Sequence, residues 1–88
     1  LVLGEGFAMK PVFVMIKCDL GKAYQVAEEI ADTIEEVSEV YSTSGQYDLL
    51  AKFYLGEDVD IGHFVTERVQ TLGGVADTFT LITFKAFS

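Results

Sequence analysis

The chain has 88 residues, half of them hydrophobic, and its six basic and fourteen acidic side chains give a formal net charge of −8. So few cations cannot neutralise a phosphate backbone, which excludes direct nucleic-acid binding and disfavours an anionic membrane surface. No apolar run of about 18 or more residues is present to span a bilayer, and a single cysteine, which cannot form an internal disulfide, fits a cytoplasmic location.

The first half of the chain predicts a strand, a helix and a hairpin. Residues 1–9 are expected to be a leader or a cloning remnant, since a signal peptide's basic start and long apolar stretch are missing. Residues 11–18 are rich in β-branched and aromatic side chains, as in a strand. From residue 22, apolar side chains recur at helical spacing for about 13 residues. Strands are predicted at 37–43 and 49–55, joined by a glycine turn.

The second half of the chain predicts a helix and a final strand. Residues 56–60 are a polar connector whose aspartates suit a helix N-cap, and residues 61–72 show helical periodicity. Two glycines predict a left-handed helix stop, and residues 75–87 predict a long final strand. Residues 10–88 thus form one domain of order β-α-β-β-α-β. This order predicts a ferredoxin-like α+β sandwich, with four antiparallel strands and both helices on one face.

The predicted strands are apolar on both faces. Two helices cover only one face of a four-stranded sheet, and a face in water should carry polar side chains at alternate positions. Covering ~600 Å² of apolar surface contributes on the order of 15 kcal/mol before association costs. We therefore expect a homo-oligomer, at least a dimer, that packs sheet against sheet; the alternative is that the N-terminal segment or long side chains cover this face. The expected interface residues are Phe13, Met15, Leu50 and Tyr54.

The glycine turn Ser44-Gly45-Gln46-Tyr47-Asp48 brings several amide donors and one carboxylate together. Gly45 can adopt the positive φ that a tight hairpin requires. A small zwitterion needs both kinds of group, since donors bind its carboxylate and an acceptor binds its ammonium group. The alternative is that Asp48 only hydrogen-bonds the amides of its own turn, as aspartate commonly does.

Catalytic and metal-binding patterns are missing from the sequence. The one histidine, His63, lies four residues before Glu67 on a predicted helix, where a surface contact accounts for it. Cys18 has no histidine beside it in sequence and is interpreted as a small buried side chain. The glycine pair at 73–74 lacks the lysine and hydroxyl residue of a phosphate-binding loop. We expect no catalytic residue, no metal and no cofactor.

Two segments, residues 44–52 and 72–80, resemble the effector-binding half of the Lrp/AsnC feast/famine regulators, the RAM domain. The resemblance extends from residue 11 to 87. It implies dimers that form through their sheets, as in dimeric α+β barrels, further assembly into tetramers of dimers, and amino-acid effectors bound between dimers at the hairpin. The implied ligand-binding residues are Ser44 at the pocket edge, Gly45 through its amide, Gln46 and Tyr47 as pocket lining, Asp48 for the ammonium group or the turn, and Ile82 and Thr83 in effector response.

The chain departs from the family pattern in two places. A helix-turn-helix is missing, so the chain resembles the stand-alone RAM type, and Gly73 replaces the usual proline. The expected function is a cytoplasmic, oligomeric amino-acid-sensing module, acting alone or within assemblies of full-length Lrp/AsnC regulators. Two alternatives remain: a small dimeric α+β barrel enzyme, and a structural adaptor that binds no ligand.

Overall fold

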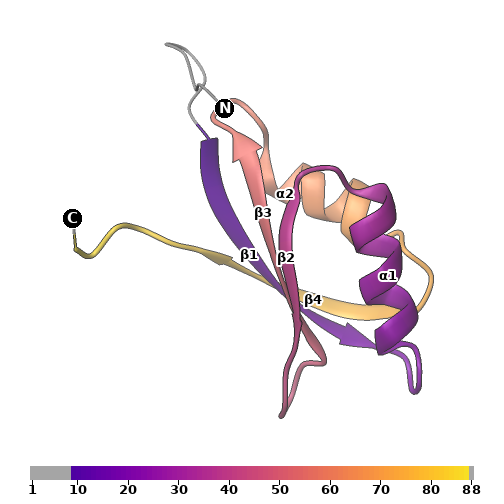
Figure 1. The fold of residues 1–88 in the computed structure, drawn as a ribbon. Coiled ribbons are helices and arrows are strands. Elements are labelled where there is room, and N and C mark those ends of the chain that lie inside the picture. The colour runs from indigo at the N-terminus through magenta and orange to yellow at the C-terminus, as the bar shows by residue number, and fades with distance from the viewer. Residues whose placement is uncertain (1–8, 88) are drawn as a thin grey trace.

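The computed structural model describes residues 9–87, and these form a sheet with helices (Figure 1). The leader expected at residues 1–9 therefore lies, apart from Met9, outside the described residues. None of the described helices is long and apolar enough to cross a bilayer. The elements in chain order are β1 (Met9–Cys18), α1 (Ala23–Thr33), β2 (Val37–Ser42), β3 (Leu49–Gly56), α2 (Ile61–Phe64), the π-helical segment η1 (Val65–Val69) and β4 (Val75–Ile82).

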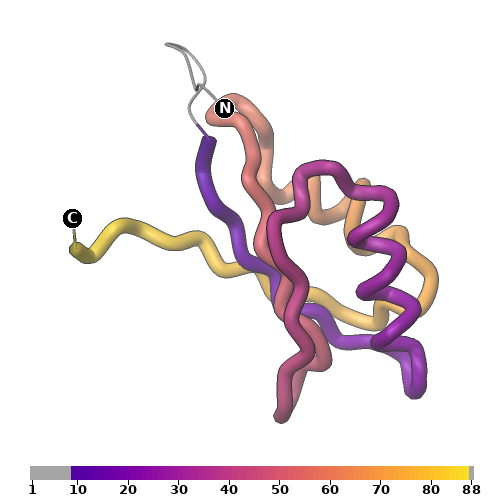
Figure 2. The backbone as a smooth tube through the Cα atoms, in the orientation of Figure 1, coloured from indigo at the N-terminus to yellow at the C-terminus, as the bar shows by residue number. Residues whose placement is uncertain are grey.

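The four strands form one antiparallel sheet in the order β2-β3-β1-β4. Both helices lie on the same side of this sheet, and no element formed by residues 9–87 covers the other side (Figure 1, Figure 2). In the sheet's middle, Val14 of β1 lies opposite Ala51 of β3 and Thr80 of β4. The predicted ferredoxin-like α+β sandwich is confirmed.

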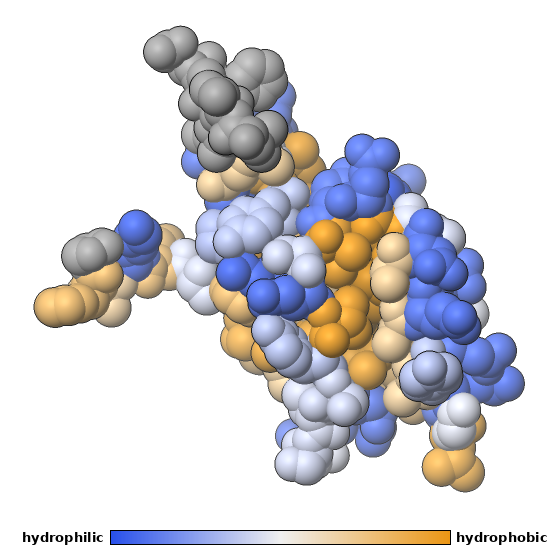
Figure 3. Space-filling model, viewed as in Figure 1, coloured by the Kyte–Doolittle hydropathy of each residue, from blue (hydrophilic) through white to orange (hydrophobic). Residues whose placement is uncertain are grey.

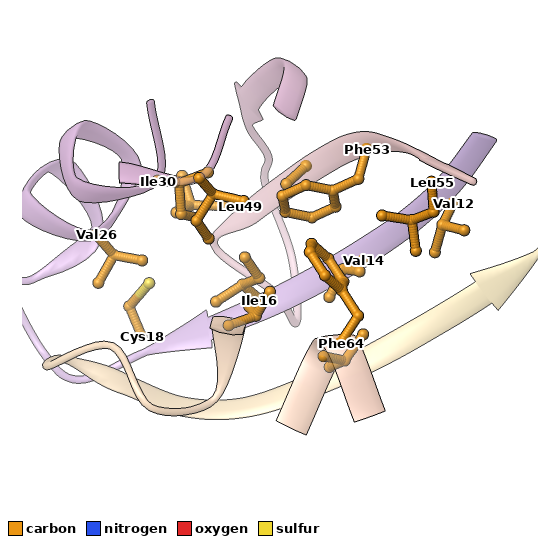
Figure 4. Close-up of a cluster of buried hydrophobic side chains, with 14 residues drawn as sticks. Val12, Val14, Ile16, Cys18, Val26, Ile30, Leu49, Phe53, Leu55 and Phe64 are labelled. Atoms are coloured by element: carbon orange, nitrogen blue, oxygen red, sulfur yellow. The ribbon is translucent and has the colours of Figure 1, made fainter. Parts of the chain in front are cut away.

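The hydrophobic core lies between the sheet and the helices (Figure 4). Alternate residues of β1 and β3 point into it because successive side chains of a strand face opposite sides. The rings of Phe53 and Phe64 meet edge to face, with centroids 5.1 Å apart, and thereby join β3 to α2. The core side chains with no more than 2% exposure are Val12, Val14, Ile16, Val26, Ile30, Ile34, Leu49, Ala51, Phe53, Leu55 and Val69.

The second predicted helix is regular only at its start. Asp60 caps α2, because its Oδ1 accepts the His63 backbone N–H at 2.9 Å. After Phe64 the chain widens into η1, where the Gln70 N–H donates to the Val65 carbonyl five residues back, at 2.8 Å. The expectation of one regular helix over 61–72 is wrong here. The β-branched side chains of residues 65–69 lower the preference of this segment for α-helical geometry, and the glycine pair at 73–74 ends the helical region.

The final strand is shorter than the predicted 75–87 and ends at Ile82. The Asp48 N–H donates to the Ile16 carbonyl at 2.9 Å, so even-numbered residues of β1 direct their backbone polar groups toward β3. The backbone polar groups of the odd-numbered residues of β1 therefore point toward β4. The last pair between the two strands is Val12 with Ile82, and the next residue of β1 that would bond to β4 is Pro11. A proline has no N–H to donate, so the ladder stops there. The last described residues run away from the sheet (Figure 1).

Candidate functional site

The hairpin between β2 and β3 is held by two hydrogen bonds across its base. The Thr43 N–H donates to the Asp48 carbonyl at 2.9 Å, and the Thr43 hydroxyl donates to the Tyr47 carbonyl at 2.7 Å. Gly45 at the tip has a φ of +103°, a conformation that side chains with a Cβ rarely adopt. The turn therefore has one defined shape that the sequence predicted from its glycine.

Asp48 uses its side chain to continue the sheet. Its Oδ2 accepts the Cys18 backbone N–H at 2.7 Å, where β1 has left the regular ladder. The carboxylate therefore takes the place of a strand carbonyl, which is not the turn-amide contact that the alternative interpretation expected. Burial raises the pKa of the Cys18 thiol, and the charges of Asp48 and Asp19 raise it further, so this thiol stays protonated and unreactive at neutral pH.

The tip of the hairpin presents its backbone to solvent. Ser44, Gly45 and Gln46 are exposed, whereas Tyr47 and Asp48 are half-buried. Among residues 9–87, the backbone N–H groups of 44–47 donate to no other protein group. Exposed amides beside a fixed carboxylate form the combination of donors and acceptor that binds a small zwitterion.

Tyr47 connects the hairpin to the far edge of the sheet. Its ring stacks on Phe79 of β4 with centroids 6.2 Å apart and an interplanar angle of 28°. Phe79 itself is 52% exposed on the side of the sheet without helices. No local motif marks Phe79 as a neighbour of the hairpin, because this contact follows from the strand order and register.

The four predicted interface residues share the side of the sheet without helices, called the open face below. Phe13, Met15 and Leu50 are half-buried there, and Tyr54 is 38% exposed. Lys52 lies between them, with its Nζ 5.7 Å from the Phe13 ring centroid and 4.9 Å from that of Tyr54. A hydrogen bond with Tyr54 raises the pKa of Lys52, so the open face carries one firmly charged ammonium group among aromatic rings.

The two remaining predicted ligand residues lie away from the hairpin within one chain. Ile82 pairs with Val12, at the opposite end of β1 from the residues next to Asp48. Four to six residues of strand separate the two positions, which is roughly 13–20 Å. Ile82 and Thr83 are both exposed. A site that contains them and the hairpin therefore requires residues from two chains, and their role stays a prediction.

The other candidate residues have structural partners. His63 is exposed, with its Nε2 4.0 Å from Glu67 in the expected surface contact. Arg68 forms an ion pair with Glu36 at 3.2 Å and lies over the Phe64 ring. Among the residues that the structure describes, no group of three or more His, Cys, Asp or Glu side chains is placed to hold a metal ion.

Four of the surface grooves are lined by residues outside the hairpin tip at 44–48. The most voluminous of these four, about 460 Å³, lies between the start of α1 and the glycine turn before β4, and its lining is about equally polar and apolar. The exposed tip of the hairpin projects from the sheet (Figure 1) and lies outside these four grooves.

Comparisons with known proteins agree with this architecture. The HTH-type transcriptional regulator FL11 of Pyrococcus abyssi is 32% identical over 91% of this chain, which spans about half the length of the curated relatives it matches. The crystal structure of TTHA0845 from Thermus thermophilus is 35% identical with a TM-score of 0.77, and the match covers 90% of this chain and 98% of that one.

A more distant structure shares the fold. The Neisseria meningitidis transcriptional regulator NMB0573, solved as its L-Met complex, is 17% identical with a TM-score of 0.76; the match covers 94% of this chain and 54% of that one. The Lrp/AsnC ligand binding domain family matches residues 11–88, nearly the whole chain. The chain therefore belongs to the Lrp/AsnC ligand-binding domain family.

Proposed function

We propose that this chain is an oligomeric module that binds an amino acid at the hairpin between β2 and β3. The observation that carries the proposal is the pairing of exposed amides at 44–47 with the carboxylate of Asp48, which is fixed by the Cys18 N–H at 2.7 Å. The amides bind the carboxylate of the ligand, and the aspartate binds its ammonium group. The family membership and the L-Met complex of the Neisseria relative support an amino acid as the ligand class.

The oligomer forms through the open face of the sheet. Its apolar and aromatic side chains include Tyr41, Phe79 and Leu81, which are 40–52% exposed, in addition to the four predicted interface residues. A contiguous apolar area of this kind is typical of an interaction surface. Contacts between such dimers then enclose the convex hairpin, and Ile82 and Thr83 of a neighbouring chain join the pocket. The same face offers a contact to the ligand-binding halves of full-length Lrp/AsnC regulators.

A binding function is favoured over an enzymatic one. Two of the relatives compared above, those from Pyrococcus abyssi and Neisseria meningitidis, are named as transcriptional regulators. The helix-side face of the sheet is mainly aliphatic, and the His63 ring lies on the surface against Glu67. The structural adaptor is the second candidate, because the bond from the Cys18 N–H to Asp48 accounts for this carboxylate without any ligand.

The test is a thermal-shift screen of the protein against the twenty amino acids at millimolar concentration. Binding at 100 times the dissociation constant stabilises the fold by about 2.7 kcal/mol, which is readily detected as a rise in Tm. The variant Asp48→Asn separates sensor from adaptor, since its amide oxygen still accepts the Cys18 N–H while the charge for the ammonium group is lost. A sensor keeps its basal Tm and loses the ligand-dependent rise.

The matched control is Gln46→Ala, which leaves both hairpin hydrogen bonds of Thr43 in place. We expect it to weaken ligand stabilisation partially and to leave the oligomer unchanged. If no amino acid moves the Tm of the wild-type chain, the sensing function is wrong and the adaptor stands.

A further inference from the structure

The tip of the hairpin has no positive charge of its own for the carboxylate of a ligand. Residues 43–47 carry no charged side chain, and Figure 3 shows the projecting hairpin, at the bottom of the view, mostly in the pale colours of intermediate hydropathy. The adjacent Asp48 carries a carboxylate, and the chain as a whole has a net charge of −8. Hydrogen bonds between two charged groups are stronger than those from neutral amides. A cation near the tip would therefore strengthen the binding of a carboxylate beside Asp48.

Lys17 is the cation that lies next to the hairpin. The Cys18 N–H that donates to Asp48 Oδ2 at 2.7 Å belongs to the peptide group that follows Lys17. The carboxylate of Asp48 is therefore within about 5 Å of the Lys17 Cα atom, which carries a flexible four-carbon stem. The remaining cationic residues have partners of their own or lie on other parts of the surface: Lys10, Lys22, Lys52, Arg68 and Lys85.

The Lys17 side chain points to the same side of the sheet as the Tyr47 ring. Ile16 is buried under the helices and Lys17 is exposed, so alternation along β1 directs the lysine to the open face. On this face the Tyr47 ring reaches across β1 to stack on Phe79 of β4. Phe79 pairs with Met15, two residues before Lys17. The lysine stem therefore stands beside the aromatic pair that leads from the hairpin.

Asp77 is the competing partner of the Lys17 ammonium group. It lies directly opposite Lys17 on β4, and its Oδ1 accepts the Thr78 N–H at 2.9 Å. No ion pair joins Lys17 to Asp77 or to another carboxylate among residues 9–87. Both side chains are exposed, and an exposed pair of this kind contributes little to stability. The ammonium group is therefore available to the carboxylate of a ligand.

We propose that the Lys17 ammonium group binds the carboxylate of the amino acid at the hairpin, so that Asp48 and Lys17 together select free α-amino acids. The two side chains offer opposite charges to the two charged groups of the ligand, and the amides of 44–47 add hydrogen bonds to its carboxylate. Derivatives that lack one charge, such as amides and decarboxylated amines, lose one of the two contacts. This inference deepens the proposed function and rests on it, because it adds a specificity-determining residue to the same site.

The test compares each amino acid with its α-carboxamide, which keeps the ammonium group and the side chain but lacks the negative charge. The probes are the twenty amino acids and their carboxamides at millimolar concentration, and those that raise the Tm are then titrated by calorimetry. We expect Lys17→Met to raise the dissociation constant of the amino acid about 10-fold or more and to change that of the carboxamide less than about twofold. Lys17→Arg keeps the charge and should recover most of the affinity.

Two further variants separate recognition from a structural role of the lysine. Lys22→Met removes the same charge at the start of α1 and should leave both dissociation constants unchanged. Asp77→Asn removes the competing carboxylate and should tighten the binding of the amino acid. If Lys17→Met weakens the amino acid and its carboxamide equally, or if Lys22→Met has the same effect as Lys17→Met, the assignment of Lys17 is wrong.

Failure of this inference differs from failure of the proposed function. If an amino acid stabilises the wild-type chain and Lys17→Met equally, the role of Lys17 is overturned while binding at the hairpin stands. If none of the probes raises the Tm of the wild-type chain, both are wrong.

Discussion

The two faces of the sheet are built from the same strands and end in different environments. In β3, Phe53 is fully buried under the helices, whereas its neighbour Tyr54 keeps 38% of its surface exposed. In β1 and β4, Val14 is fully buried while Phe79 on the other side is 52% exposed. One chain therefore completes one face by itself. The other face has the composition of a core but no covering layer among residues 9–87, which supports the contact proposed for it.

The largest expected effect comes from opening a cavity in the core between the sheet and the helices. Phe53→Ala leaves a cavity beside Phe64 and should lower the free energy of unfolding by about 3–5 kcal/mol, measured by urea denaturation. Tyr54→Ala, the adjacent residue on the open face, is the control. Its effect should vary with protein concentration, whereas that of Phe53→Ala should persist at every concentration. Equal, concentration-independent losses would contradict the distinction between the faces.

The next largest effect comes from a charge on the open face. Leu50→Glu places a carboxylate at the centre of the expected contact, where it would have to lose its water. We expect the dimer dissociation constant to rise at least about 100-fold, measured by sedimentation velocity. Leu20→Glu adds the same charge at a fully exposed turn and should leave the association unchanged. An unaffected Leu50→Glu dimer would show that another surface forms the contact.

A smaller effect should come from the tight packing beside α1 on the covered side. Gly74 has a φ of +96°, and a Cβ there would lie 3.0 Å from the Cγ2 atom of Val26. Gly74→Ala should therefore cost about 1–3 kcal/mol of stability. At the adjacent Gly73, a Cβ meets nothing within 4 Å and no positive φ is required, so Gly73→Ala should be nearly neutral. Similar losses in both variants, measured by thermal or urea unfolding, would contradict this assignment.

The smallest expected effect is on the pH dependence of stability, through the buried thiol of Cys18 at the end of β1. Burial, followed by the charges of Asp48 and Asp19, raises the folded-state pKa of Cys18 above its ordinary value of 9.0. Above pH 9 the unfolded thiol loses its proton before the folded one does, so stability falls as pH rises. Cys18→Ala should reduce this fall, seen as a flatter dependence of Tm on pH. An identical dependence in the variant would contradict the role of this thiol.

The sequence predicted the fold because its signals are local. Strand and helix periodicities located the elements, and the lack of apolar/polar alternation in β1 and β3 predicted a second apolar face before any strand was paired. The end of β4 was not predictable in this way. It depends on Pro11, about 70 residues earlier, through the direction of a backbone group that is known only once the register of β1 is fixed.

The sequence indicated the residues of the candidate site but only some of the contacts that they make. Gly45 and Asp48 were singled out from residue type and spacing, and the positive φ at Gly45 follows from its lack of a side chain. The bond from the Cys18 N–H to Asp48 and the stacking of Tyr47 on Phe79 were missed. Both contacts join segments about 30 residues apart, and no pattern within one strand contains them.

The two oxygens of the Asp48 carboxylate differ in their contacts, which affects how a ligand could approach this side chain. Oδ2 accepts the Cys18 N–H at the end of the β1–β3 ladder. A cation bound to Oδ2 would compete with this N–H for the same lone pairs. Oδ1 is the atom that a guest can use without disturbing the strand. In the proposed complex, an ammonium group restricted to one oxygen would have one preferred direction of approach, set by the bond that holds the other oxygen on β1.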